Sequence, residues 1–376
     1  GEGDYRMQNP YWIAYRNLRL NQKKRYMLSA QLSYDITDWL NISGRVRVDN
    51  THTKYEQKLY ASSNLTITEE STQGHYTISK PDETQTYADV LANINKRFND
   101  FSLVANVGAS IVNNRYEDLS YRGPIREKGI PNVFNVFDLD NTKKKARQDE
   151  WQEQTQSIFA SVEVGWKSML YLTLTGRNDW ASQLANSSTP CFFYPSVGLS
   201  GVISEMLTLP EFIDYMKVRG SFSSVGMPYP RNLTSPTYEY DEANQQWKPK
   251  THYPIKDLKP ERTNSWELGL DMRLFKDFSL GFSWYLANTF NQTFDPKVSV
   301  SSGYSKIYLQ TGYVRNSGVE LSLGYGHTWN NHLHWESNFT LSHNKNTIKD
   351  LVTSYIHPET GLPITQNRLD VGGLGK

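Results

Sequence analysis

Few side chains in this sequence stand in a pattern that catalysis would need. Cys191 is the sole cysteine; it follows Pro190, precedes two phenylalanines and has no histidine nearby in the sequence. A nucleophilic serine would be expected in a Gly-x-Ser-x-Gly turn, and the sequence contains no such turn. We therefore expect no catalytic residues and a protein that is not an enzyme.

A metal site has equally little support. His332 and His334 are two residues apart, a spacing that places both side chains on one face of a strand and could chelate a metal ion. No third ligand lies close to them in the sequence. We interpret both as solvated residues beside a turn, and expect neither a metal nor another cofactor.

Aromatic and charged residues are better candidates for binding. Tyr238, Tyr240 and Trp247 stand among carboxylate and amide residues in a polar stretch, and such a mixture suits stacking on a sugar or a peptide. Loop aromatics also pack loops against their neighbours, and this alternative stays open. Arg177 and Asp179, alternate residues of a predicted strand, form the second candidate binding site.

The composition limits the partners. The 376 residues include 40 Lys plus Arg and 39 Asp plus Glu, so the net charge of +1 disfavours nucleic acid. The basic run from Lys143 to Arg147 is too short to change this, and we interpret it as solvated or in contact with lipopolysaccharide. Only 38% of the residues are hydrophobic, and no run approaches the roughly 18 apolar residues of a membrane helix.

The elements that carry these residues repeat with a period of two. Leu170, Leu172 and Leu174 alternate with polar residues, as do the apolar residues from Trp266 to Leu274. We expect roughly twelve such strands of about nine to eleven residues, the length of a tilted bilayer crossing. One face would be apolar and the other charged. The predicted lipid-facing residues are Leu28, Ile42, Leu172, Leu268 and Phe282, and the predicted inward ones are Arg45, Arg177, Glu267 and Asp271.

Short and long connections alternate along the chain, the order of an outer-membrane barrel with short periplasmic turns and long extracellular loops. The predicted short turns lie at 35–38, 99–100, 167–168, 276–277 and 330–331, and the predicted long stretches at 51–84, 113–152, 228–259 and 291–314. A brief helical turn is expected at 209–212. We expect no strand near either end of the sequence, so these strands form part of a barrel that must close elsewhere, because backbone groups in lipid need internal partners.

Aromatic residues are concentrated beside the predicted short turns, where they would form the girdle of a membrane interface. They are Trp39, Phe101, Trp166, Phe275, Phe278, Trp329 and Trp335.

The stretch LKPERTNSWELGLDMRLFKDFSLGFSWYLANTFN, from Leu258 to Asn291, resembles the barrel signature of the SusC/RagA family of TonB-dependent outer-membrane transporters. Further similar segments follow in the family's order. They are Asn9-Pro10-Tyr11-Trp12, Tyr194-Pro195-Ser196-Val197-Gly198-Leu199, Lys217-Val218-Arg219-Gly220-Ser221-Phe222 and Gly312-Tyr313-Val314-Arg315-Asn316.

The resemblance implies an all-β fold, an antiparallel transmembrane barrel in the bacterial outer membrane, of which residues 1–376 would be a part without plug, TonB box and terminal strands. It implies nutrient uptake of a glycan or an oligopeptide. The implied partners are a SusD-like surface lipoprotein acting as a lid, the TonB complex through segments outside this sequence, and outer-membrane lipid. The alternatives are a soluble β-sheet glycan-binding protein and, less favoured, an outer-membrane β-barrel enzyme.

Overall fold

The computed structural model describes residues 9–185, 187, 189–229, 231, 238–241, 246–249, 252–253, 259–294, 306–307, 309–329, 333–350, 352–356 and 363–366. In this part of the chain, no helix is long and apolar enough to cross a membrane.

Strands dominate the structure. The main sheet consists of β1 (Asn17–Thr37), β2 (Leu40–Tyr60), β3 (Gly74–Ser79), β4 (Asp82–Phe98), β5 (Phe101–Pro124), β6 (Lys145–Trp166), β7 (Leu170–Ala181), β8 (Cys191–Val202), β9 (Ile213–Met227), β13 (Glu261–Leu274), β14 (Phe278–Phe294), β16 (Leu309–Trp329) and β17 (Leu333–Asp350). Three small sheets pair β10 (Tyr238–Asp241) with β11 (Gln246–Pro249), β12 (His252–Tyr253) with β15 (Lys306–Ile307), and β18 (Val352–Ile356) with β19 (Pro363–Gln366). The helical turns are α1 (Pro10–Arg16), η2 (Val136–Asp138), η3 (Ser182–Leu184) and α2 (Ile203–Met206).

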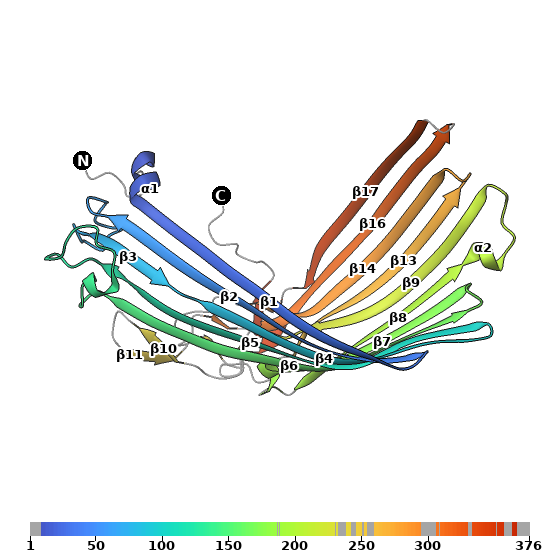
Figure 1. Ribbon diagram of the computed structural model, residues 1–376, viewed down its shortest axis with the longest axis horizontal. Helices are drawn as coiled ribbons and strands as arrows, with labels where there is room; N and C mark the ends of the chain where they lie inside the picture. Colours follow the sequence, from blue (N-terminus) through green and yellow to red (C-terminus); the bar gives the residue numbers. More distant parts are fainter. Residues whose placement is uncertain are drawn as a thin grey trace. The chain divides into compact units, whose positions relative to one another are not determined.

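The main sheet follows the chain almost in order. Its hydrogen-bonded path is β1-β2-β3-β5-β6-β7-β8-β9-β13-β14-β16-β17, and β4 pairs with β2 and β5. From β6 to β9, and from β13 to β17, each strand runs antiparallel to the next, and these strands lie side by side in Figure 1. Neighbours in sequence are therefore neighbours in the sheet, as hairpins with short turns produce.

The chain divides into two compact units. Unit 1 comprises residues 1–32, 44–89 and 111–154, and it contains the buried side chains of Leu59, Tyr76, Ile125 and Leu139. Unit 2 comprises residues 33–43, 90–110 and 155–376. Its buried cluster is small and consists of Ala181, Leu184, Phe192 and Tyr229.

In unit 2 the predicted alternation of faces is confirmed. Leu172 pairs with Leu199, and Leu268 pairs with Trp284, so apolar side chains stand opposite apolar side chains across the strands. Phe282 pairs with Leu270 and lies on this same apolar face, because residues directly opposite in an antiparallel pair share a face. Residues of odd number on β7 and β13, among them Arg177, Glu267 and Asp271, therefore lie on the other, polar face.

The first two strands follow the same rule. Arg25 of β1 donates from Nε to Asp49 of β2 over 2.8 Å, so these two residues share a face. Arg45 lies on that polar face because it is an even number of residues from Asp49, whereas Leu28 and Ile42 alternate onto the apolar face. All nine predicted orientations are thus distributed on the two faces as the sequence predicts.

The predicted strand length is wrong. The strands of the main sheet other than the six-residue β3 contain 12 to 24 residues, β5 being the longest. Much of two predicted loops is strand, because β2 extends to Tyr60, β5 to Pro124, and β6 begins at Lys145. Most side chains at these strand ends are polar on both faces. The backbone hydrogen bonds between strands therefore continue where the sequence has no alternation of apolar and polar residues to indicate a strand.

Other boundaries also differ. The predicted helical turn at 209–212 is wrong; the helical turn is α2, at Ile203–Met206, and Pro210 lies after it. A strand does lie near the carboxyl end, because β-branched and aromatic residues of Val352–Ile356 pair with β19. The first short turn is at Asp38 and Trp39, the turns at Asn99, Lys167 and Lys276 are confirmed, and residues 330–331 lie outside the described residues.

The aromatic residues beside the short turns are exposed. Trp39, Phe101, Trp166, Phe275, Phe278, Trp329 and Trp335 all expose more than a third of their surface. Two of them, Phe275 and Phe278, form a continuous row with Phe212 and Tyr325. Phe212 stacks on Phe275 at 5.5 Å, Phe275 contacts Phe278 at 6.4 Å, and Phe278 contacts Tyr325 at 4.7 Å between ring centroids. The row spans four strands at one end of the sheet, as an interfacial girdle would.

Candidate functional site

The polar face of unit 2 carries a charged cluster centred on Arg219 of β9. Its Nη1 lies 2.7 Å from the Asp271 carboxylate, its Nη2 lies 3.5 Å from the Glu267 carboxylate, and Nη2 also donates to Ser283 over 2.8 Å. Gly269, which is opposite Arg219, leaves room for this side chain, because a Cβ there would lie 2.5 Å from Nε. Glu267 and Asp271, predicted as inward residues, therefore share one cation and keep exposed oxygen atoms for a further partner.

Arg177 and Asp179 form a second polar cluster on β7. Arg177 Nε donates to Asp179 over 2.7 Å, and its Nη2 donates to Ser157 of β6 over 2.9 Å. The Arg177 guanidinium also lies 5.8 Å from the Phe159 ring centroid, so the side chain is held from three directions. Asp179 is buried, whereas the Arg177 side chain is 44% exposed. A fixed, accessible guanidinium of this kind suits recognition of a carboxylate or a hydroxyl group.

The predicted aromatic site lies on the β10–β11 hairpin. Tyr240 is directly opposite Trp247, and Tyr238 is opposite Pro249. The Trp247 side chain is 68% exposed, while the side chains of Tyr238 and Tyr240 lie outside the described ones. The backbone brings these three positions together on one small hairpin, and their binding role stays a prediction.

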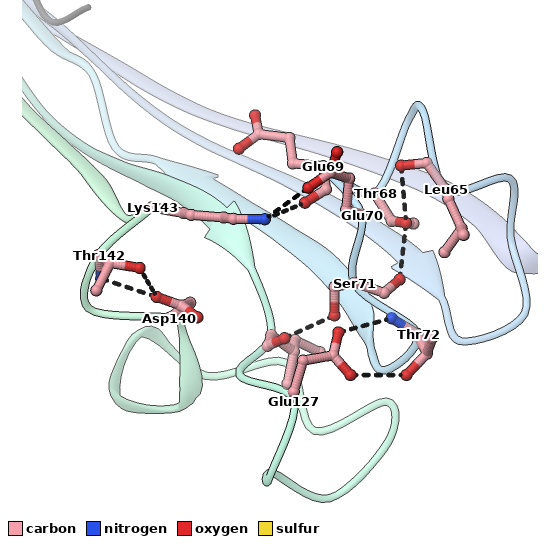
Figure 2. Close-up of polar contacts among 11 residues, drawn as sticks. Leu65, Thr68, Glu69, Glu70, Ser71, Thr72, Glu127, Asp140, Thr142 and Lys143 are labelled. Atoms are coloured by element: carbon pink, nitrogen blue, oxygen red, sulfur yellow. Dashed lines mark hydrogen bonds and ion pairs between the residues drawn. The ribbon is translucent and has the colours of Figure 1, made fainter.

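Two connections in unit 1 are held against each other by their own polar side chains (Figure 2). Both carboxylate oxygens of Glu127 accept hydrogen bonds from Thr72, one from the backbone N–H at 3.1 Å and one from the hydroxyl at 2.9 Å. Ser71 donates to the carbonyl of Ile125 over 2.6 Å. We call residues 61–73 and 125–144 the loop cluster, because these contacts tie the β2–β3 connection to the β5–β6 connection.

Lysine 143 adds a third link within the loop cluster. Lys143 Nζ donates to the Glu69 carbonyl over 2.9 Å and lies 3.3 Å from the Glu70 carboxylate (Figure 2). Lys144 donates to Asn141 over 3.2 Å. Lys143, the first residue of the basic run, therefore links the two connections. The interpretation of this run as solvated did not predict that link.

The loop cluster has its own core and an exposed apolar edge. Ile125 and Leu139 are 1% exposed, which is rare for residues in long connections. In contrast, Ile130 is 72% and Phe137 is 76% exposed, and Val133 is 37% exposed. Large apolar side chains presented by a backbone that is already ordered are typical of a protein contact surface.

Hydrogen bonding controls the acidity of two carboxylates in the loop cluster. The backbone N–H and the hydroxyl of Thr72 lower the pKa of Glu127 below its ordinary value, because they stabilise the charged form. The hydroxyl and backbone N–H of Thr142 lower the pKa of Asp140 in the same way. Both groups therefore remain ionised, and able to hold these contacts, at mildly acidic pH.

His332, His334 and Cys191 are the residues that the sequence offers for metal binding or nucleophilic chemistry. No group of three or more His, Cys, Asp or Glu side chains there could hold a metal ion. His334 contacts the Thr328 hydroxyl at 2.9 Å across the β16–β17 hairpin, and His332 lies outside the described residues. Cys191 is a free thiol at the start of β8.

Sequence reasoning proposed Arg177 and Asp179, which contact each other in the structure and whose binding role stays a prediction, and it missed the loop cluster. The signal was present: Ile125, Ile130, Val133 and Phe137 are apolar residues within a stretch that was treated as uniformly polar. Contacts between residues more than 50 positions apart, such as Ser71 with Ile125, could not be read from either segment alone.

Comparisons with known proteins agree with this architecture. A profile of the family described as TonB dependent receptor-like, beta-barrel matches residues 2–370. TonB-dependent receptor P26 of Formosa agariphila is 26% identical over 226 residues, which cover 58% of this chain and 23% of that protein. TonB-dependent receptor P39 of the same organism is 24% identical over 275 residues, covering 69% and 25%.

Among solved structures, the RagAB peptide transporter is similar with a TM-score of 0.78 at 17% identity, covering 96% of this chain and 40% of that chain. This chain thus spans about a quarter of the length of the two curated relatives. The resemblance to the SusC/RagA family drawn from the sequence is confirmed. Because the family's profile matches residues 2–370, nearly the whole chain, the chain belongs to the TonB-dependent receptor-like β-barrel family.

Proposed function

We propose that this chain is part of the barrel domain of an outer-membrane importer that takes up a glycan or an oligopeptide with energy from TonB. In this proposal the apolar face contacts outer-membrane lipid, and the polar face lines the interior and contacts a plug. The loop cluster and the β10–β11 hairpin contact a SusD-like lid lipoprotein or the ligand itself.

The exposed apolar face is the observation that carries the proposal. Leu174, Leu199, Trp266, Leu268 and Leu341 come from four strands, β7, β8, β13 and β17, and are each 45 to 56% exposed. Soluble proteins rarely expose a continuous apolar surface of that extent. Lipid would cover it, and the girdle row at the turn ends supplies the interface that such a sheet needs.

The rival hypothesis, a soluble β-sheet glycan-binding protein, is hard to reconcile with this face. A soluble sheet keeps one face wet and polar and buries the other against a core. Here the polar face holds Arg219, Glu267 and Asp271, while the opposite apolar face has no covering layer in the described part of unit 2.

The test uses the full-length receptor in its own cells. We expect it in the outer-membrane fraction, and we expect its deletion to abolish growth on one class of polymer, either a glycan or a peptide mixture. Loss of TonB should have the same effect. Recovery of the receptor in the soluble fraction, or unchanged growth and uptake on all polymers after deletion, would contradict the proposal.

The binding role of Arg177 and Asp179 is tested by the double substitution R177Q/D179N. We expect the folded receptor to remain in the membrane and ligand uptake to fall about tenfold, as loss of a charge-assisted contact of about 1.4 kcal/mol would produce. A matched control exists in R147Q/D149N, because Arg147 and Asp149 form a similar pair two residues apart on β6. Equal effects of both variants would exclude a specific role for Arg177 and Asp179.

A further inference from the structure

One row of polar side chains ends the apolar face in unit 2. In the register of the sheet, Ser224 of β9 is opposite Asn264 of β13, which is opposite Asn288 of β14, which is opposite Arg315 of β16. The row next to it, toward the short turns, contains Phe222, Trp266 and Leu286. On β9, β13 and β14 the apolar face thus changes from aromatic and aliphatic to polar within one step, whereas on β16 the residue of the preceding row, Ser317, is already polar.

Arg262 lies one row beyond and is held by neutral groups. Its Nε donates to Ser224 over 2.7 Å, and Ser224 in turn donates to Asn264 over 2.7 Å. Its Nη2 donates to the backbone carbonyl of Phe193 over 3.3 Å. Gly226, opposite Arg262 in the register, has no side chain, so the guanidinium can extend across β9 toward β8.

Arg315 is held in the same manner. Its Nε donates to Asn288 over 2.9 Å, its Nη2 donates to the Tyr313 hydroxyl over 2.5 Å, and that hydroxyl donates to Asn288 over 3.0 Å. The Tyr313 ring stacks on Phe290 with centroids 4.8 Å apart. An aromatic pair therefore fixes the position of the second guanidinium.

Neither arginine is neutralised within the part of unit 2 that the structure describes. No carboxylate there lies within ion-pair distance of Arg262 or Arg315, and Asp350, which is opposite Tyr313, makes no ion pair with Arg315. Lys345, opposite Ser317, adds another cation beside this row. A guanidinium has five N–H groups, and contacts with described residues use two of them in each arginine, which leaves three without an acceptor among those residues.

The position of the two arginines matches the far border of a bilayer. Arg262 is twelve residues from Leu274, at the turn end of β13, and Arg315 is ten residues from Tyr325 of β16. At about 3.3 Å per residue and a tilt of about 40°, these separations correspond to roughly 25–30 Å along the membrane normal. The apolar band of an outer-membrane barrel is about 25 Å tall.

A cavity of about 300 Å³ adjoins Arg262. Its lining includes Phe193, Lys259, Asn291, Glu261 and Arg262. Lys259 and Arg262 bring two positive charges to this lining, and Glu261 brings one negative charge. The cavity has room for an anionic group larger than a water molecule.

We propose that Arg262 and Arg315 bind the phosphate group of an outer-leaflet lipid headgroup at the upper border of the apolar face. Phosphate matches the planar fork of a guanidinium, and a phosphate attached to acyl chains would extend them over Trp266 and Leu268. The inference rests on the proposed function, because it requires that the apolar face lies in a bilayer. A soluble ligand with a carboxylate would not reach this face, because in the proposal the face is covered by lipid.

The test compares the full-length receptor with its R262Q/R315Q variant, both extracted in detergent from the outer membrane. Native mass spectrometry measures retained lipid, with added monophosphoryl lipid A and its dephosphorylated form as probes. We expect the original protein to retain the phosphorylated probe and the variant to retain at least tenfold less. The matched control K217Q/R273Q removes two positive charges from the polar face of β9 and β13 and should retain the probe.

A separate variant distinguishes loss of the binding site from misfolding. R262K/R315K preserves both charges, and we expect it to retain at least half of the bound probe. Equal retention of both probes, unchanged retention in R262Q/R315Q, or displacement of the lipid by an equal concentration of inorganic phosphate would each overturn the site. A receptor that is absent from the outer membrane would instead contradict the proposed function. Membrane fractionation before the detergent extraction separates this result from a failure of the lipid site.

Discussion

At the scale of residues, the cost of a charge on the apolar face depends on its depth in the membrane. Leu270 is five residues from the Phe275 turn and opposite Phe282 and Val218, near the middle of the apolar band. Leu172, in contrast, is two residues from the turn end of β7. We therefore predict that Leu270→Arg destabilises the folded barrel by about 2–4 kcal/mol, and Leu172→Arg by about 0–1 kcal/mol.

Equilibrium folding of the full-length receptor into lipid vesicles at increasing urea measures this difference. Ser221→Arg is the matched control, because Ser221 is opposite Glu267 on the polar face and a new arginine would meet a carboxylate there. If Leu270→Arg and Ser221→Arg had the same free energy of unfolding, the assignment of the two faces would be wrong.

These orientations could be predicted from the sequence, because the alternation of apolar and polar residues can be read within a single strand without knowing its neighbours. Leu172 and Arg177, or Leu268 and Asp271, are separated by odd numbers of residues, and their hydrophobic contrast fixes both faces. The partners of Arg177 could not be predicted, since the contact with Ser157 depends on the register between β6 and β7.

At the scale of elements, the loop cluster depends on Glu127. We predict that Glu127→Gln increases the opening of residues 61–73 about fivefold to tenfold, because a hydrogen bond to a charged acceptor is stronger than a hydrogen bond to a neutral one. Hydrogen exchange of the Thr72 amide, which donates to Glu127, measures it. Glu150→Gln, on β6 and outside the loop cluster, is the control, and an effect there as large as in Glu127→Gln would exclude a specific role for Glu127.

The same contact predicts a pH dependence. The pKa of Glu127 is lowered from its ordinary value of 4.5, so its contribution to loop stability is complete above pH 4.5 and is lost as the pH falls through the lower, folded-state pKa. Protection of the Thr72 amide, corrected for intrinsic exchange, should be constant from neutral pH to about pH 5 and then decline. Glu127→Gln should remove this dependence; a decline that persists in the variant would assign it to another group.

The exposed edge of the loop cluster should contribute to partner binding. Phe137 is 76% exposed, and its ring lies 5.2 Å from the Arg126 guanidinium. Phe137→Ala should therefore change loop stability little, and it should weaken binding of the lid lipoprotein by about 2 kcal/mol if Phe137 is a central anchor. Titration of purified lid against the receptor measures this, with Trp247→Ala in parallel as the sequence-predicted anchor. Unchanged affinity for the lid in both variants would show that neither loop forms the contact surface.

The bounds of strands and helical turns were predicted less completely than the faces on which their side chains lie. The strand ends at Thr51–Tyr60 and Lys145–Gln152 carry polar residues on both sides, so no period distinguishes them from loops. The helical turn was predicted at 209–212, six residues after its observed position in α2 at Ile203–Met206.

At the scale of the whole molecule, β1 and β17 occupy the two ends of the described sheet path, and nearly all of their residues are exposed. We propose that further strands of the receptor pair with these edges. Residues 1–376 produced alone should therefore fail to give a heat-resistant folded band in lipid vesicles, because unpaired edges in lipid are costly and prone to aggregation. The full-length receptor should give that band, and a folded, monodisperse product from residues 1–376 alone would contradict the proposal.

The central claim is that the apolar face of this sheet contacts lipid. It is tested most directly by spin labels at each position from 266 to 273 in the full-length receptor, after Cys191, the only cysteine of this chain, is replaced by serine. In outer-membrane vesicles we predict a period of two: oxygen collisions high at Trp266, Leu268, Leu270 and Met272, and low at the alternating positions, where a water-soluble nickel complex has better access. Equal access of oxygen and the nickel complex at all eight positions would contradict the account.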